Sequence, residues 1–567
     1  MDTSKLNKRE RYKAQMSPFD FYAEFEDMDF ENLSEGERFY LQDYGIFNTV
    51  FLEDEFTIRI RIPGGRIATE HFQKIAEIVK RYDLTIILTA RAGIQLHDIE
   101  AEDVLEVHKA INALGVTTWQ SFGDNVRNIV TDPYDGVSQA SVFEVYPLIE
   151  QMQEYIIKNP RFVGMLPRRV SIGISANPAN VVSFFANDIY FALAQKEGAF
   201  GFNVYLGGKN SEVAQSADIF LNYDEVFDFY KAFLETFYKH GSRFSRSKTR
   251  LFHLIEDIGM EGLKTYLTAE YGKEFENAGS LELSHKNFDS FEPLKDGRFA
   301  YRYLTDFSRL DADEILELSD FASKNSLEVR FGIDQNIYFI GLQKPEVPFK
   351  KAFHNATVLT CAGNLCPYAV WSIKDDTEYL PLELIEQHQI HIGFSGCAKG
   401  CGRHHHTDIG LIGLKTSHFG DVEGGARVFL GAEHSEGIST GRMLYSMVPF
   451  LHLKALLTLI ITIYEAQDVT PFEVYAKKVL NQHSEEFLSM WYLLNLKEKK
   501  ELAIPAGVDR SFISEQRLLE EAFGKEVYVA KDEKNFKATI SALSQELWFV
   551  EGKDPNYKPP IERHDFR

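Results

Sequence analysis

The sequence predicts an α+β protein that carries two copies of one structural unit. Residues 56–99 align without a gap on residues 299–342, at an offset of 243 positions that pairs Arg59 with Arg302. Each copy has the alternating apolar residues typical of a strand, then apolar residues at helical spacing, then a second alternating run. A gapless register of this length favours duplication over chance similarity.

Two inserts separate and follow the copies, and a fainter likeness between the inserts supports the duplication. The run GFNVYLGGKNS near Gly201 resembles ARVFLGAEHSEG near Ala426, and both end a strand in a glycine-containing turn. The order unit, insert, unit, insert predicts a pseudo-twofold protein with a ligand at the seam between its halves. The predicted segments are an N-terminal helical arm (1–54), the paired units (55–122 with 296–348), a first insert (123–295), a second insert (349–500) and a C-terminal extension (501–567).

The composition narrows the class of protein. The chain has 567 residues and a formal net charge of −23, because 84 Asp and Glu outnumber 61 Lys and Arg. A nucleic-acid binder needs a basic face to neutralise phosphates, so we expect no nucleic-acid partner. The most apolar stretch, Met447–Tyr464, contains Pro449, His452 and Lys454 and predicts a buried helix rather than a membrane span. The basic first residues lead into no apolar core, so we expect no secretory signal and a cytoplasmic location.

The cysteines form one tight group, which indicates a metal site. A cytosolic protein with so few, closely spaced thiols is more often holding a metal than forming disulfides. Structural zinc accepts four thiolates in closely spaced pairs, and a [4Fe–4S] cluster accepts the same four and needs small residues beside them. Glycines surround these thiols, but zinc sites also use glycine, so the local pattern favours neither metal. The four residues are Cys361, Cys366, Cys397 and Cys401.

Cations and amides gather at strand ends and turns in the first half of the chain. Arg59 and Arg61 alternate with isoleucines, so both point to one face of a strand whose other face is apolar. A purely structural strand has little reason to line one face with guanidinium groups. A ligand with several carboxylates provides one, because arginine binds carboxylates bidentately. The other members of this set are Arg91, Gln95, His97, Asn125, Arg127, Asn128, Arg168 and Arg169.

Taken together, these motifs resemble the nitrite and sulfite reductase family, which couples a siroheme to a [4Fe–4S] cluster. The resemblance follows the family's order over roughly residues 10–480. It implies duplicated ferredoxin-like half-domains plus two mixed α/β domains that bind the siroheme and the cluster. The matching motifs are RIRIPGG, LTARAGIQLH, GDNVRN, LPRR, FGFNVYLGG, the first cysteine pair and SGCAKGCGRHHHTDIGLIG.

The resemblance also implies a role for each matching residue. Four cysteines would hold the cluster, and the last of them would also be the axial ligand of the siroheme iron. Three arginines would lie over the open face of the iron, where they bind the substrate anion and help to deliver protons. Six further residues would contact the siroheme carboxylates. The cluster ligands are Cys361, Cys366, Cys397 and Cys401, the substrate arginines are Arg59, Arg127 and Arg169, and the siroheme contacts are Arg61, Arg91, Gln95, His97, Asn125 and Asn128.

Departures from the family's usual pattern bear on the substrate. Only four residues separate Cys361 from Cys366 where five are usual, and Lys399 replaces an amide residue in the second cysteine pair. Ser171 stands where sulfite reductases have a lysine and nitrite reductases an asparagine. Because sulfite carries up to two charges and nitrite one, the lost cation favours nitrite. We therefore expect six-electron reduction of nitrite to ammonia, with sulfite reduction to sulfide as the alternative.

Two other interpretations stay open on the sequence. A family member in corrinoid biosynthesis has a similar core but acts on a tetrapyrrole, and the arginines over the iron argue weakly against it. A non-catalytic zinc or iron–sulfur protein would use the four thiols only to hold its fold.

The electron donor must be a separate protein. The chain has no glycine-rich nucleotide-binding fingerprint in a strand-to-helix context and no cysteines for a second cluster. The resemblance suggests ferredoxin, which is usually acidic like this chain, so a local basic patch would be required. The stretch Arg243–Arg250 is one candidate for that patch, and a solvated loop or a buried ion-pair network is the alternative for it.

Overall fold

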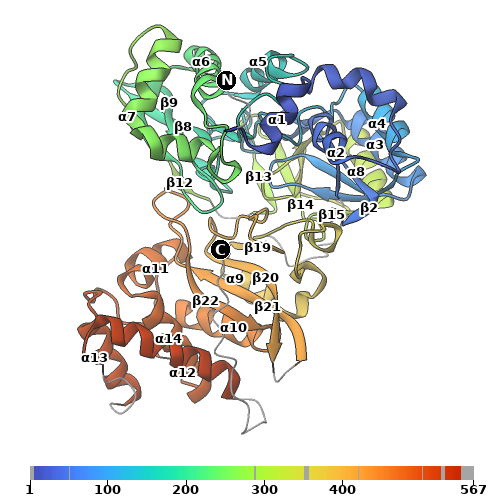
Figure 1. Cartoon of the computed structure of the whole chain (residues 1–567). Coiled ribbons are helices and arrows are strands. Elements are labelled where there is room, and N and C mark those ends of the chain that lie inside the picture. The colour runs from blue at the N-terminus through green and yellow to red at the C-terminus, as the bar shows by residue number, and fades with distance from the viewer. Residues whose placement is uncertain are drawn as a thin grey trace. The chain divides into compact units, whose positions relative to one another are not determined.

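The computed structural model forms two compact units (Figure 1). The first unit comprises Met1–Pro367 with Ser435–Gly437, and the second comprises Tyr368–His434 with Ile438–Arg567. The division of the chain into five segments stays a prediction, and residues 1–4 and 551–567 of its two ends lie outside the described residues. The structure describes residues 5–49, 51–286, 289–349, 357–418, 421–500, 502–524 and 530–550.

Both copies of the repeat form the predicted strand, helix and strand. The helix of the first copy buries Phe72, Ile75, Ala76 and Val79 at helical spacing, which places its apolar face on the sheet. The first copy comprises β2 (Leu52–Ile60), β3 (Arg66–Ile67), α3 (Thr69–Arg81), β4 (Thr85–Leu88) and β5 (Ile94–Glu100). The second comprises β14 (Phe299–Tyr303), β15 (Arg309–Leu310), α8 (Ala312–Lys324), β16 (Glu328–Phe331) and β17 (Ile337–Leu342).

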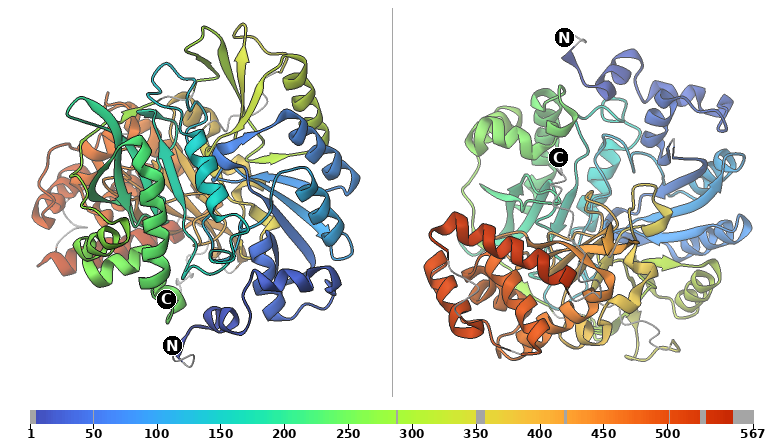
Figure 2. Two further views of the ribbon diagram at one scale, coloured as in Figure 1. Left: turned by 90° about the horizontal axis from the view of Figure 1, so that it is seen from above. Right: turned by 60° about the horizontal axis from the view of Figure 1, so that its bottom comes forward.

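Each copy contributes its two-residue strand to the sheet of the other copy. Ile67 of β3 lies opposite Val329 of β16, and Leu310 of β15 lies opposite Ile86 of β4. The offset of the repeat relates these two pairings, so the exchange is reciprocal and the expected pseudo-twofold α+β fold is confirmed. The two copies lie side by side with α3 packed against α8, as the blue and yellow-green segments of Figure 2 show. With β1 (Ile46–Thr49) and β13 (Phe291–Pro293), the sheet orders are β1-β2-β5-β4-β15 and β13-β14-β17-β16-β3.

The remainder of the first unit surrounds these two sheets. The N-terminal segment is helical before it enters β1, and α1 begins at an Asn7 cap whose side chain accepts two backbone hydrogen bonds. The first insert forms a mixed sheet in which β6 runs parallel to β8, with helices packed on its apolar face. The helices are α1 (Lys8–Gln15), α2 (Glu35–Leu41), α4 (Val104–Ala113), α5 (Tyr146–Ile156), α6 (Val226–His240) and α7 (Leu251–Tyr271). The strands are β6 (Ile172–Ser175), β7 (Ala179–Asn180), β8 (Ile189–Lys196), β9 (Ala199–Leu206), β10 (Gln215–Leu221), β11 (Ser280–Leu281), β12 (Ser284–His285) and β18 (Val358–Thr360).

The second unit is a sheet covered by helices. β19 runs parallel to β20, and β20, β21 and β22 follow as antiparallel neighbours. The predicted buried helix is confirmed as α10, which buries Leu453, Leu457 and Ile461. Among the described residues, no helix is long and apolar enough to cross a membrane. The strands are β19 (Ile392–Ser395), β20 (Ile409–His418), β21 (Asp421–Leu430) and β22 (Arg442–Pro449), and the helices are α9 (Leu382–Gln387), α10 (Phe450–Glu465), α11 (Phe472–Lys478), α12 (Glu485–Glu498), α13 (Phe512–Phe523) and α14 (Glu533–Val550).

The described part of the C-terminal extension packs onto the second unit. Both α13 and α14 contact α12. The Ser484 hydroxyl at the start of α12 donates to Glu515 Oε2 at 2.6 Å, and Phe536 and Ile540 of α14 are buried. Through these contacts α13 and α14 pack on the second unit.

Candidate active site

Two neighbouring loops of the first unit carry Arg127 and Arg169. The backbone N–H of Arg127 donates to the carbonyl of Val170 at 2.7 Å, and the N–H of Val170 donates to the carbonyl of Asn125 at 3.0 Å. The side chain of Arg127 is buried, and its guanidinium group donates to the carbonyl oxygens of Ser121 and Gly123. Backbone pairing of the two loops therefore fixes the backbone positions from which the Arg127 and Arg169 side chains extend.

The electrostatics of Arg127 show that four arginines gather at this place. Burial, reinforced by the positive charges of Arg59, Arg169 and Arg91, holds the pKa of Arg127 well below its ordinary value. Its buried Nε has no hydrogen-bond partner among the described residues. A buried cation is costly unless an anion compensates it, so this cluster is suited to an anionic ligand.

Arg59 reaches the cluster from β2 and is held by a short chain of polar side chains. Its guanidinium carbon lies 3.8 Å from the centre of the Phe122 ring. With the Gln95 amide oriented to satisfy both neighbours, its oxygen accepts from Arg59 Nη2 at 2.6 Å and its nitrogen donates to His97 Nε2 at 2.9 Å. His97 Nδ1 in turn lies 3.2 Å from the Thr57 hydroxyl. Arg59, Gln95 and His97 therefore form one hydrogen-bonded row across β2 and β5.

Three of the predicted siroheme contacts are bonded to the protein itself. Arg61 is 1% exposed, and it donates to the carbonyls of Val126 at 2.7 Å and Arg127 at 3.1 Å. The Asn125 amide nitrogen donates to Asp43 Oδ1 at 2.6 Å, and the Asn128 amide nitrogen donates to the carbonyl of Ile62 at 2.6 Å. Burial lowers the pKa of Arg61 to about 10. These donors hold the loop that carries Arg127, and this arrangement favours a positioning role for Arg61, Asn125 and Asn128.

A buried carboxylate that the sequence analysis did not single out anchors the same loop. Asp124 accepts from Arg246 through both oxygens, at 2.7 and 2.8 Å, and from Lys13 Nζ at 3.0 Å. Burial alone would raise the pKa of Asp124, but the charges of Lys13 and Arg246 outweigh it and hold the pKa below its ordinary value. The sequence could have pointed to this role only through the presence of an aspartate in the motif GDNVRN, three residues before Arg127.

The arginines of the stretch Arg243–Arg250 are paired with carboxylates of the first unit, which favours an ion-pair network over a docking patch at this place. Arg243 Nη1 donates to Glu10 Oε2 at 2.6 Å, and Arg250 Nη2 donates to Asp188 Oδ1 at 2.7 Å. These two arginine side chains are 12% and 13% exposed, and their charges are matched inside the unit. Of the three interpretations of this stretch, the pairing favours the buried ion-pair network, and docking there stays a prediction.

Ser171 belongs to this network. Its hydroxyl donates to Asp188 Oδ2 at 2.7 Å, its backbone N–H donates to the same oxygen at 2.8 Å, and the residue is 1% exposed. The other oxygen of Asp188 accepts from Arg250. The hydroxyl of Ser171 therefore contributes to the protein's internal bonding, and the position carries no cation.

The first cysteine pair lies at the end of β18 in the first unit. The backbone N–H of Gly363 donates to Cys361 Sγ at 3.3 Å, and the N–H of Cys366 donates to the carbonyl of Gly363 at 3.0 Å. Gly363 has a φ of +68°, a conformation that glycine adopts without strain. This tight turn accommodates the shortened spacing and aims an N–H group at a sulfur, which fits the requirement of an iron–sulfur cluster.

The second pair lies in the loop between β19 and β20 in the second unit. Cys397 is partly buried, which raises the pKa of its thiol, whereas Cys401 is exposed. The Ser395 hydroxyl binds the N–H of Gly402 at 3.0 Å and His404 Nδ1 at 2.9 Å, so it holds the returning loop. None of the four cysteines forms a disulfide. Like the first pair, Cys397 and Cys401 lie on a glycine-containing turn, as cysteines that hold a metal do.

The three histidines after Cys401 pack beside the loop. His404 and His405 lie against Phe429, with ring centres 5.3 and 4.5 Å apart. Burial lowers the pKa of His404 to about 3 and lowers that of His405. A neutral imidazole is a poor acid at neutral pH, so His404 and His405 are better suited to packing beside the loop than to supplying protons.

The duplicated α+β scaffold, the buried arginines and the thiols on glycine-containing turns indicate a metal-binding protein, and comparisons with known proteins support one family. Residues 52–114 match the model of the "Nitrite/Sulfite reductase ferredoxin-like half domain", and residues 122–275 match that of the "Nitrite and sulphite reductase 4Fe-4S domain". Both matches are to models of one family and support the nitrite and sulphite reductase family for this chain. The second match covers a segment without cysteines, since the thiols lie in the later half.

Relatives and a solved structure span most of the chain. A ferredoxin–nitrite reductase of Synechococcus elongatus is 29% identical over 467 residues, which cover 76% of this chain and 91% of the relative. An assimilatory ferredoxin-dependent nitrite reductase of Haloferax mediterranei is 25% identical, over 78% of this chain and 86% of the relative. The structure of the Mycobacterium tuberculosis NirA protein covers 83% of this chain and 96% of its own at a TM-score of 0.75 and 21% identity, which confirms the fold.

Proposed function

We propose that this protein is a ferredoxin-dependent nitrite reductase that reduces nitrite to ammonia. The observation that carries the proposal is the arginine cluster around Arg127. Two relatives that this chain matches over most of their length are named ferredoxin–nitrite reductases. An electrostatic site built from several guanidinium groups binds a small anion and inverts the negative field that an anionic macrocycle would create.

The cofactors of the proposal are a siroheme and a [4Fe–4S] cluster. Cys361, Cys366, Cys397 and Cys401 would hold the cluster, and the exposed Cys401 would be shared with the siroheme iron. When bound, these groups supply the stored electrons that no amino-acid side chain can supply. Arg91 is our candidate for the siroheme carboxylates, together with Gln95 and His97, which extend the row that begins at Arg59.

The chain's own residues bind the anion and orient it. Arg59, Arg127 and Arg169 would bind the nitrite oxygens through N–H groups, and the buried setting strengthens each interaction. Arg61, Asn125 and Asn128 would keep the Arg127 loop in place through the hydrogen bonds described above. The Gln95 oxygen accepts from Arg59 while its nitrogen donates to His97 Nε2, so this row would hold the Arg59 guanidinium in position.

Nitrite is preferred over sulfite on charge. Ser171 brings no cation to the position where sulfite reductases carry a lysine, and the nearby Arg250 is already paired with Asp188. A site with one cation fewer binds a singly charged anion relatively better than a doubly charged one. Sulfite reduction to sulfide stays the alternative, and no observation favours the corrinoid-type or the non-catalytic interpretation.

The test is anaerobic turnover of the cofactor-loaded protein with reduced viologen, with nitrite and sulfite compared side by side. We expect a higher kcat/KM on nitrite, with ammonia as product, and turnover with reduced ferredoxin in place of viologen. A higher kcat/KM on sulfite would contradict the assignment. No turnover of either anion by protein that shows a siroheme spectrum would favour the corrinoid-type relative, and colourless protein would favour a zinc protein.

A further inference from the structure

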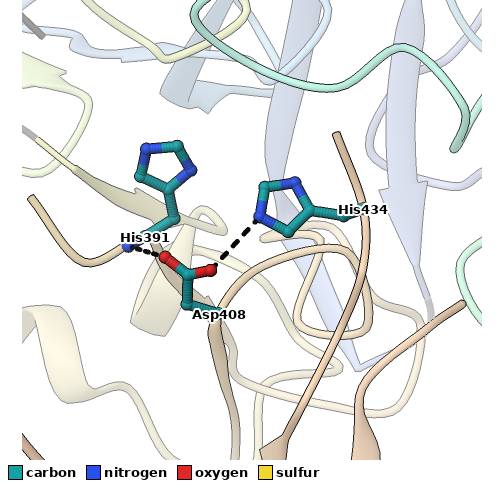
Figure 3. Close-up of side chains that lie close together, drawn as sticks. All are labelled: His391, Asp408 and His434. Atoms are coloured by element: carbon teal, nitrogen blue, oxygen red, sulfur yellow. Dashed lines mark hydrogen bonds and ion pairs between the residues drawn. The ribbon is translucent and has the colours of Figure 1, made fainter. Parts of the chain in front are cut away.

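A second group of metal-binding side chains lies buried in the second unit, apart from the cysteines. His391 immediately precedes β19, Asp408 immediately precedes β20, and His434 follows β21 (Figure 3). One potential ligand atom from each residue lies within 4.8 Å of the others. The three residues are 8%, 4% and 2% exposed. Three separate elements therefore bring two imidazoles and a carboxylate to one buried place.

A second carboxylate near His434 comes from α11. His434 Nε2 lies 3.5 Å from Asp408 Oδ1 and 3.9 Å from Glu473 Oε2. Ligand atoms that lie about 2.1 Å from a tetrahedral zinc ion are about 3.4 Å apart. The separation of His434 Nε2 from Asp408 is therefore of the size expected between two ligands of one zinc ion.

We propose that His391, Asp408 and His434 bind a zinc ion. Two imidazole nitrogens and a carboxylate oxygen are donors that Zn²⁺ accepts, and Glu473 beside His434 is the candidate for the fourth position. A divalent cation would also offset the charge of the buried Asp408 carboxylate. This site is separate from the thiolates and does not depend on the proposed nitrite reduction.

The site would clamp the base of the loop that carries two of the cluster cysteines. The loop between β19 and β20 holds Cys397 and Cys401. β19 begins directly after His391, and β20 begins directly after Asp408. The backbone N–H of His391 donates to Asp408 Oδ2 at 2.8 Å, and the N–H of Ile409 donates to the carbonyl of His391 at 3.1 Å. A cation bound to both side chains would lock this hydrogen-bonded base and keep the thiols in register.

The experiment measures zinc in the intact holoprotein. The protein is expressed with added Zn²⁺, dialysed, and analysed for zinc and iron by inductively coupled plasma mass spectrometry. We expect about one equivalent of tightly bound zinc, as in structural zinc sites. Zinc-edge X-ray absorption of the same sample should show nitrogen and oxygen ligands and no sulfur. Zinc below about one tenth of an equivalent, or zinc bound to sulfur, would overturn the proposal.

Two variants make the assignment specific. His434→Ala should lose the zinc. His483→Ala is the matched control, because His483 is also a buried histidine of this unit and bonds to the carbonyl of Pro505 at 2.7 Å. It should keep the zinc. Zinc retained in His434→Ala would overturn the proposal. If that variant does not fold, the zinc content and zinc-edge X-ray absorption of the unmodified protein decide the question.

Discussion

The two copies of the repeat use equivalent arginines in opposite ways. In the second copy, Arg302 Nε donates to Asp334 Oδ2 at 2.9 Å, and both side chains are buried. Asp334 also accepts from the Tyr338 hydroxyl at 2.8 Å. In the first copy the repeat offset places Arg59 at the position of Arg302 and Arg91 at the position of Asp334. Where one copy has an ion pair, the other has two cations.

The difference separates scaffold from site. A buried arginine with a carboxylate partner is compensated and holds the fold, as Arg302 does. Arg59 and Arg91 instead add their charges to that of Arg127 and lower its pKa. Such an accumulation of like charge costs stability and persists where an anionic ligand supplies the missing charge. The same contrast recurs within one loop, where Asp124 is fully paired and Arg127 is surrounded by cations.

The largest effect we expect is a loss of stability when a buried ion pair of the scaffold is broken. Asp124→Asn leaves Arg246 without its carboxylate and Lys13 with Glu10 alone, and breaking such a buried pair costs about 3–5 kcal/mol of unfolding free energy. Because the folded-state pKa of Asp124 is depressed, its contribution is complete above its unfolded-state pKa of about 4 and declines as pH falls below it. The two proteins should therefore differ in Tm at pH 7 and converge in acid.

The control for this measurement is Asp228→Asn, which removes an exposed carboxylate paired with Lys231. Its unfolding free energy should change by less than about 1 kcal/mol. Equal Tm values for Asp124→Asn and the unmodified protein at pH 7 would show that the network does not hold the loop.

On the site side, Arg127→Met should lower kcat/KM for nitrite by about 10²–10³-fold, the usual effect of removing one donor aimed at developing charge. The Tm should not fall in proportion, because the lost group is a buried cation repelled by three neighbours. Activity is measured per loaded siroheme, alongside thermal unfolding. A variant with normal turnover would remove Arg127 from the site.

A charge exchange tests the contrast directly. Arg91→Asp gives the first copy the carboxylate that Asp334 provides in the second, so Arg59 acquires the ion-pair partner that Arg302 has. We expect a tenfold to hundredfold higher KM for nitrite, which corresponds to about 1.4–2.8 kcal/mol of lost anion binding. Arg91→Gln is the control and should have a smaller effect. Identical KM values for both variants would mean that charge at this position does not matter.

The smallest effect we expect is at Ser171. Ser171→Ala removes one hydrogen bond to Asp188, which costs about 1 kcal/mol of stability. The ratio of kcat/KM on nitrite to that on sulfite should change less than about threefold, since removing an internally bonded hydroxyl leaves the charge of the site unchanged. A tenfold change in this ratio would show that the hydroxyl itself contacts the substrate.

The repeat and the residue types of the site could be predicted from the sequence. The offset of 243 predicted the correspondence of α3 with α8 and of β4 with β16, because both copies carry the same periodicity. It did not predict the exchange of β3 and β15, since a two-residue strand is too short to show a pattern. The exchange depends on tertiary pairing alone.

The roles of single side chains were harder to predict. Arg61 and Asn125 are residue types that often bind an anionic ligand. In the structure they instead form hydrogen bonds to a carbonyl and a carboxylate far away in the sequence. The stretch Arg243–Arg250 looked basic because its partners Glu10, Asp124 and Asp188 come from distant segments. The group around His434 has no short-spacing motif, since His391, Asp408 and His434 are scattered over three elements.

The most direct test of the account compares Arg59→Met with Arg302→Met as cofactor-loaded proteins. Nitrite turnover with reduced viologen is measured per loaded siroheme, and Tm is measured on the same samples. We predict that Arg59→Met loses about 10²–10³-fold in kcat/KM with little change in Tm. Arg302→Met should lose about 3–5 kcal/mol of stability and keep its turnover per loaded centre. Equal losses of turnover in both variants would contradict the division between site and scaffold.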